Sequence, residues 1–220
     1  MVDIPLQCRC GKVTGIAKNT SPSNGNRLVC YCKDCQAFAQ ILHHKHCTQD
    51  STDDSSANRE QASDNFVLDT DGGTEVFQMP PSRLHISKGH EHIACLRLTP
   101  KGTYRWYTQC CHTPIGNTLT AGVPFIGLIH SFISLTDKER QQSLGIIRGY
   151  IQARDIYNES TGSEDTTTKK HPGMPLLIGL RTITCLALWK LKRLERPNPL
   201  FSSEGLPLAK PEIISSKTQR

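Results

Sequence analysis

The sequence predicts a mainly β protein with a helical C-terminal extension. Three observations support this. Short strand-like segments separated by Gly and Pro run to about residue 118, three cysteine clusters lie among them, and an apolar segment bounded by prolines follows at about 175–195. We therefore expect a β domain over 1–118 and an extension over 119–220 with an irregular tail. The hydrophobic fraction of 36% allows only a small core, which a bound metal could stabilise.

The predicted elements follow one another closely up to residue 107. Residues 11–17 alternate like a strand, and residues 27–31 form a second strand that leads into a cysteine cluster. The other strand candidates cover 74–78, 84–86, 93–98 and 103–107. Helices are expected at 34–42, at 137–144 with Thr136 as N-cap, and at about 175–195. Residues 48–65 are rich in Ser, Asp, Gln and Asn and predict a flexible insert.

Seven of the ten cysteines fall into the three clusters. They are Cys8 and Cys10, then Cys30, Cys32 and Cys35, and finally the adjacent pair Cys110 and Cys111. Thiolates two or three residues apart can chelate one metal ion without a large movement of the backbone, as in cysteine–zinc sites. The spacing therefore predicts one or two bound Zn²⁺ ions.

Disulfides are the alternative use of these cysteines. The N-terminal segment 1–7 contains an acid and a proline but no apolar run, so we expect no signal peptide and a reducing, cytoplasmic setting. A disulfide between Cys30 and Cys32 would also close a strained ring. The sequence thus favours metal over disulfide, and zinc over an iron–sulfur cluster, because the cysteine runs typical of ferredoxins are missing.

The middle cluster could hold a metal with an open coordination position. On a strand, residues 30 and 32 face the same side, and a turn through Lys33 and Asp34 can bring Cys35 back toward them. Three thiolates around Zn²⁺ leave one tetrahedral position for water or a substrate thiol. A structural zinc with its fourth ligand elsewhere in the chain is the alternative.

The first pair needs partners from far along the chain, because two ligands do not hold a structural zinc. Cys110 and Cys111 are the obvious candidates, and such a site would join the first and last strands of the β region.

These clusters together resemble the glutathione-dependent formaldehyde-activating enzyme family, which includes centromere protein V-like proteins. The matching segments are Cys-Arg-Cys-Gly at 8–11, Cys-Tyr-Cys-Lys-Asp-Cys-Gln at 30–36 and Cys-His-Thr-Pro-Ile at 111–115. The resemblance covers about residues 4–118, while the remainder looks more like a bacterial branch of the same superfamily. It implies a β-tent (GFA-like) fold, a structural zinc at Cys8, Cys10 and the late cysteines, and an active-site zinc at Cys30, Cys32 and Cys35.

The activity that the resemblance implies is that of a carbon–sulfur lyase. Such an enzyme adds a thiol such as glutathione to a small aldehyde and reverses that addition. The chain departs from the family at its late cysteines, because Thr108 stands where the first cysteine of a Cys-x-x-Cys pair belongs. Either the adjacent Cys110 and Cys111 bind one ion across a sharp bend, or three thiolates are joined by another ligand such as His112.

Composition and charge give little support to other partners. A net charge of +6 in 220 residues is modest and does not favour nucleic acid, and no apolar stretch reaches the ~20 residues that a membrane span needs. The helix at 175–195 has a basic end, which suits its dipole but could also contact nucleic acid or an acidic membrane. Its leucines predict a face packed on the domain or on a second copy of the chain, so a homo-oligomer stays open. The leucines concerned are Leu176, Leu177, Leu180, Leu188 and Leu191. A non-catalytic zinc-stabilised binding module that uses this basic helix as its contact surface is the alternative to an enzyme.

Overall fold

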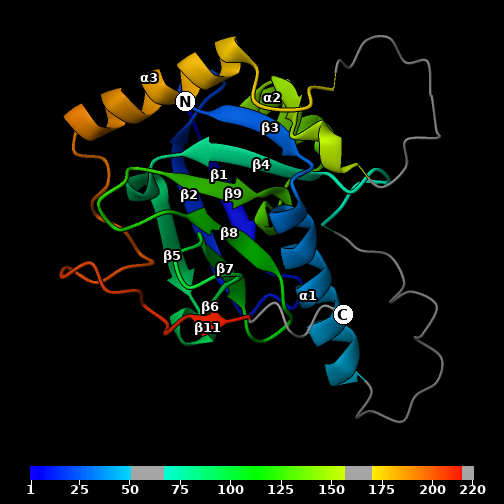
Figure 1. Cartoon of the computed structure of the whole chain (residues 1–220). Coiled ribbons are helices and arrows are strands. Elements are labelled where there is room, and N and C mark those ends of the chain that lie inside the picture. The colour runs from blue at the N-terminus through cyan, green and yellow to red at the C-terminus, as the bar shows by residue number, and fades with distance from the viewer. Residues whose placement is uncertain (51–66, 157–169, 215–220) are drawn as a thin grey trace.

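The computed structural model describes residues 1–50, 67–156 and 170–214, and it is mainly β (Figure 1). The strands are β1 (Val2–Gln7), β2 (Thr14–Thr20), β3 (Asn26–Cys30), β4 (Thr74–Met79), β5 (Leu84–Lys88), β6 (Ile93–Arg97), β7 (Tyr104–Thr108), β8 (Pro114–Thr118), β9 (Ile126–Ile129), β10 (Gly149–Ile151) and β11 (Glu212–Ile213). The α-helices are α1 (Lys33–Asp50), α2 (Asp137–Leu144) and α3 (Leu176–Leu191). The predicted mainly β class is confirmed.

The strands form two sheets. A three-stranded antiparallel sheet has the order β1-β2-β5, and an eight-stranded sheet has the order β10-β3-β4-β9-β8-β7-β6-β11. Only the two outermost pairs of the larger sheet, β10 with β3 and β11 with β6, are parallel. Strands β9, β10 and β11 lie beyond residue 118 and nevertheless join this sheet. The division of the chain into 1–118 and 119–220 stays a prediction.

Alternating side chains divide the core between the two faces of the larger sheet. Phe77 and Trp106 belong to a cluster shared with Ile4 and Leu6 of the small sheet. Their neighbours in sequence, such as Val76 and Tyr107, belong to a second cluster that includes side chains of α1. The larger sheet is therefore packed between the small sheet and α1, as expected from the two-residue period of a strand.

Helix α1 is longer than the sequence predicted. It begins at Lys33 and ends at Asp50, not at residue 42. Phe38, Ala39 and Leu42 anchor its first half in the core. The predicted insert at 48–65 lies outside the described residues except for 48–50, which end α1. The Thr136 N-cap is confirmed, and Thr136 and Glu139 form a capping box.

The leucines of α3 do not pack on the domain, which was one of the two arrangements predicted for them, and contact with a second copy of the chain stays a prediction. The helix is present within the expected range, but the five leucines assigned to its packed face are all exposed, from 49% for Leu188 to 82% for Leu191. Its buried residues are Cys185 and Trp189. None of the helices among the described residues combines the length and the hydropathy needed to cross a membrane.

Candidate metal centres

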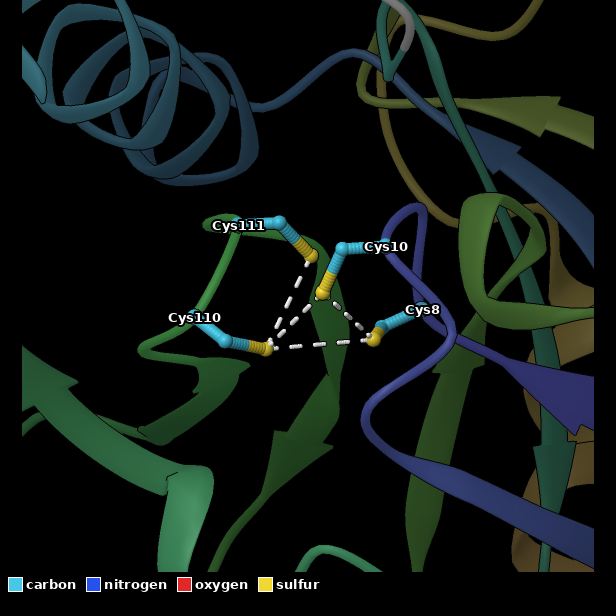
Figure 2. Close-up of side chains that lie close together, drawn as sticks. All are labelled: Cys8, Cys10, Cys110 and Cys111. Carbon is cyan, nitrogen blue, oxygen red and sulfur yellow. Dashed lines mark hydrogen bonds between the residues drawn. The ribbon is translucent and has the colours of Figure 1, made fainter. Parts of the chain in front are cut away.

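Four cysteines from two distant turns meet in one group (Figure 2). Cys8 and Cys10 lie in the turn that follows β1, and Cys110 and Cys111 lie in the turn between β7 and β8. The sulfur–sulfur distance is 3.6 Å between Cys8 and Cys10 and 3.3 Å between Cys10 and Cys110. Cys110 is 3.9 Å from both Cys8 and Cys111. Strands β1 and β7 belong to different sheets, so the group joins the two.

The dimensions of this group fit a tetrahedral thiolate site. A Zn–S bond of about 2.3 Å implies an edge of about 3.8 Å between two sulfurs of the tetrahedron. The four measured distances lie around that value. Cys8, Cys10, Cys110 and Cys111 form no disulfide, so none competes for these sulfurs.

A tight turn lets the adjacent Cys110 and Cys111 face the same point. The amide of Thr108 donates to the carbonyl of Thr113 at 2.8 Å, and the amide of His112 donates to the carbonyl of Thr108 at 2.8 Å. His112 has a φ of 53°, in the left-handed region, which supplies the bend. The group thus contains both adjacent cysteines and not His112, whose ring stacks on Tyr107.

Hydroxyl and amide groups surround the sulfurs of this four-cysteine group. The hydroxyl groups of Thr108 and Thr113 lie 3.4 Å and 3.2 Å from the Cys111 sulfur, and the amide of Val13 donates to the Cys8 sulfur at 3.2 Å. Burial raises the pKa of Cys111, but hydrogen bonds from Thr108, Thr113 and Cys10 together outweigh it and bring the pKa to about 6. Burial also raises the pKa of Cys8. Hydrogen bonds to sulfur of this kind orient metal ligands and support the thiolate form.

Cys30, Cys32 and Cys35 form the second group, with their sulfurs within 4.8 Å of one another. The predicted geometry was wrong in one respect, because β3 ends at Cys30 and does not extend to Cys32. Cys32 lies in the connection, and Cys35 lies in the first turn of α1 with its amide donating to the carbonyl of Cys32 at 2.9 Å. The junction of a strand and a helix therefore gathers the three sulfurs.

The three sulfurs favour a thiolate at Cys32. Hydrogen bonds from Cys30 and Cys35 lower the pKa of Cys32, and the positive charge of Arg105 lowers it further. The pKa of Cys30 is raised, chiefly by its hydrogen bond with Cys32. Such sharing of one negative charge among close thiols is expected where each additional thiolate repels the first.

A buried cation lies close to this three-cysteine group. Arg105 of β7 is 3% exposed, and its guanidinium lies 5.5 Å from the centroid of the Phe38 ring of α1. It donates to Asp34 at 3.3 Å and to Asn117 at 3.4 Å, while its Nε has no hydrogen-bond partner among the residues that the structure describes. A buried positive charge favours thiolates over thiols in its neighbourhood. Arg105 lies in the strand predicted at 103–107, but its position beneath α1 depends on the sheet.

Gln36 and Asp155 hold the connection beside the three-cysteine group. The Gln36 amide donates to the backbone carbonyls of Tyr31 at 2.9 Å and Asp155 at 2.7 Å. The Asp155 carboxylate lies 3.9 Å from the ammonium of Lys33, which is 83% exposed. Sequence reasoning missed Asp155, and no local signal marks it, since 119 residues separate it from Gln36.

Comparison with known families gives one result. A model of a family of unknown function (DUF6151) matches residues 56–212, which is more than half of the chain. Of the seven clustered cysteines, this match contains only Cys110 and Cys111. A comparison with curated proteins gives no match.

Proposed function

We propose that this chain, which belongs to the DUF6151 family, is a zinc-dependent enzyme of the carbon–sulfur lyase type that acts on adducts of a thiol and a small aldehyde. The observation that carries the proposal is the difference between the two cysteine groups. Among the described residues one group offers four sulfurs and the other offers three. Four protein ligands close a zinc site, whereas three are typical of a catalytic site.

Zinc suits both groups because every donor is a cysteine sulfur. Soft thiolate ligands select Zn²⁺ over hard cations such as Mg²⁺ or Ca²⁺. Cys8, Cys10, Cys110 and Cys111 would hold a structural ion, and Cys30, Cys32 and Cys35 would hold a second ion that acts in catalysis. Thiolate ligands of this kind require a reducing setting, and a cytoplasmic location supplies it.

The proposed reaction is the reversible addition of a thiol to an aldehyde. One carbon–sulfur bond forms, the carbonyl double bond is reduced in order to a C–O single bond, and the thiol proton is transferred to the carbonyl oxygen. No oxidant or reductant is needed. A bound zinc would supply Lewis acidity, which lowers the pKa of a thiol substrate.

The chain's own groups would assist this addition electrostatically. Arg105 stabilises negative charge near the three-cysteine group, and burial of its guanidinium limits screening by water. Gln36 fixes the connection that carries Cys32 by holding two backbone carbonyls. The resemblance of the cysteine segments to the formaldehyde-activating enzymes supports a glutathione-like thiol as the substrate.

Metal content and thiol–aldehyde exchange together test this proposal. Elemental analysis of the protein purified without chelator is expected to give two zinc ions per chain. With glutathione and formaldehyde as probes, exchange spectroscopy is expected to show faster exchange with the wild type than without protein. Cys32→Ser should return the rate to the uncatalysed value, while Cys185→Ser, outside both groups, should leave it unchanged.

Two results would contradict the proposal. One is protein without bound metal, and the other is an exchange rate that Cys32→Ser leaves unaltered. The spectrum of the cobalt-substituted protein gives a third criterion, because exogenous thiol should change the spectrum only if one position at the three-cysteine group is exchangeable. A spectrum insensitive to added thiol would indicate a closed site and a non-catalytic, zinc-stabilised binding module.

A further inference from the structure

Helix α3 presents an apolar face to solvent. Six large aliphatic side chains along it are about half exposed or more. Two smaller residues on the same side of the helix, Thr184 and Ala187, are also exposed. The six are Leu176, Leu177, Leu180, Ile183, Leu188 and Leu191. In Figure 1 the helix lies across one end of the molecule, next to β3. We call these eight residues the α3 outer face.

Polar contacts on the opposite side fix the rotation of α3 about its axis. Arg181 donates to the side chain of Asn26 and to the carbonyls of Pro22, Ser23 and Gly25. The Thr182 hydroxyl lies 3.2 Å from Gln78 Oε1. Turning the apolar face inward would break these hydrogen bonds and bury the Arg181 charge without partners, which is costly. The outward position of the leucines is therefore built into the fold.

We propose that the α3 outer face binds the same face of a second copy of this chain, with the two helices antiparallel about a two-fold axis. The spacing of its residues favours a helical partner. Leu177, Leu180, Thr184, Ala187 and Leu191 follow one another at intervals of three and four residues, the pattern of a coiled-coil seam. The small side chains of Thr184 and Ala187 lie at its centre, where they permit close approach of the two helices.

The size of this face agrees with an interface between two copies. Its six large side chains expose on the order of 700 Å², above the ~300–600 Å² of the largest apolar patch on an ordinary monomer and close to the ~800 Å² that each partner contributes to a stable interface. Met174, 42% exposed and packed against Gly179, extends the face at its N-terminal end. Self-complementarity is what a two-fold interface requires.

The charges near α3 select the antiparallel orientation. The outer face contains no carboxylate, and Lys190, Lys192 and Arg193 gather at the C-terminal end of the helix, where Lys190 pairs with Glu195 at 2.9 Å. A parallel pair would bring these cations together. An antiparallel pair separates them by about the helix length, ~24 Å at 1.5 Å per residue, which exceeds the Debye length of about 8–10 Å at physiological salt.

Charge variants at Ile183 test this arrangement. Ile183 is 64% exposed and lies at the middle of α3, so in an antiparallel pair it meets its own counterpart beside the seam. Sedimentation equilibrium of the full-length wild type is expected to give twice the chain mass of 24.5 kDa. Ile183→Glu and Ile183→Lys should each weaken association at least 100-fold, because like charges meet at the axis. An equimolar mixture of the two variants should recover the dimer.

Matched controls separate this interface from misfolding and from other partners. Leu206→Glu changes a leucine that is 60% exposed outside α3 and should leave the dimer intact. Recovery in the mixture shows that both variants are folded. A wild type that is monomeric at about 100 μM overturns the proposal, as do single variants that remain dimeric. Binding of monomeric wild type to vesicles containing anionic phospholipid, lost in Ile183→Glu, would assign the face to lipid instead and also overturns it.

Discussion

The two cysteine groups differ in how the chain brings their sulfurs together. The four-cysteine group joins turns about a hundred residues apart, which extend from strands of different sheets. The three-cysteine group lies within six residues of sequence, where β3 passes into α1. Long-range closure constrains the unfolded chain far more than local closure does. A metal at the first group would thus stabilise the fold, whereas a metal at the second would mainly serve chemistry.

Replacing one ligand in each group gives the largest expected contrast. Cys110→Ser should lower the melting temperature of the zinc-loaded protein by roughly 10 °C or more. A metal bound there would be coupled to folding, and in a chain of this size each ~1 kcal/mol corresponds to about 2–4 °C. Cys32→Ser should lower it by only a few degrees. Thermal unfolding followed by circular dichroism measures both values.

The contrast would fail if the two substitutions had equal effects on the melting temperature. Zinc content must be determined for each variant, because the expected loss is one ion in both cases. A Cys185→Ser variant, which leaves all seven clustered cysteines in place, measures the cost of a buried serine without loss of a ligand.

A smaller effect is expected from the hydroxyl groups around the four-cysteine group. The Thr113 hydroxyl lies 3.2 Å from the Cys111 sulfur and accepts from the amide of Arg9 at 3.1 Å. Thr113→Val keeps the shape but removes both hydrogen bonds, so metal affinity at this group should fall about 10–100-fold. Competition with a chromophoric chelator measures the affinity, and Thr120→Val, at an exposed position, is the matched control. An unchanged metal affinity would mean that the Thr113 side chain contributes packing but that its hydroxyl does not support the four-cysteine group.

The sequence predicted β2, β3 and β7 beside the two groups and the convergence of Cys8 and Cys10 with the late cysteines, but it predicted neither β1 nor β8. It could not decide how Cys110 and Cys111 both reach one point, because that depends on the left-handed backbone at His112 and the hydrogen bonds across the turn. Spacing alone indicated the four cysteines that meet there, while the bend is a tertiary feature.

The exposed leucines of α3 have a physical cause. Periodicity indicates that a helix has an apolar face, but not which side of the helix the rest of the fold will cover. Arg181 decides this for α3, since its partners near residue 25 come from a distant turn. The strands β10 and β11 were not predicted because two or three residues carry no usable period.

The smallest expected effect concerns the charge beside the three-cysteine group. Hydrogen bonds from Cys30 and Cys35 lower the pKa of Cys32, and Arg105 adds to that lowering. Thiols must lose their protons to bind metal, so a higher thiol pKa means that metal is released at a higher pH during acidification. Arg105→Gln removes the cation and should move the pH of half-release upward by about 1 unit, equivalent to ~1.4 kcal/mol.

Cadmium NMR of the cadmium-loaded protein can follow the two groups separately, because each bound ion gives its own resonance. In Arg105→Gln only the resonance of the three-cysteine group should be lost at the higher pH, while that of the four-cysteine group serves as an internal reference. Arg97→Gln is the matched control, because Arg97 belongs to the neighbouring strand β6 and stacks on Tyr104 instead. Two results would show that the Arg105 charge does not act on Cys32 and its neighbours: loss of the three-cysteine resonance at a lower pH than in the wild type, or an equal change in the pH of loss for both resonances. The electrostatic difference between the groups would then have to come from burial alone.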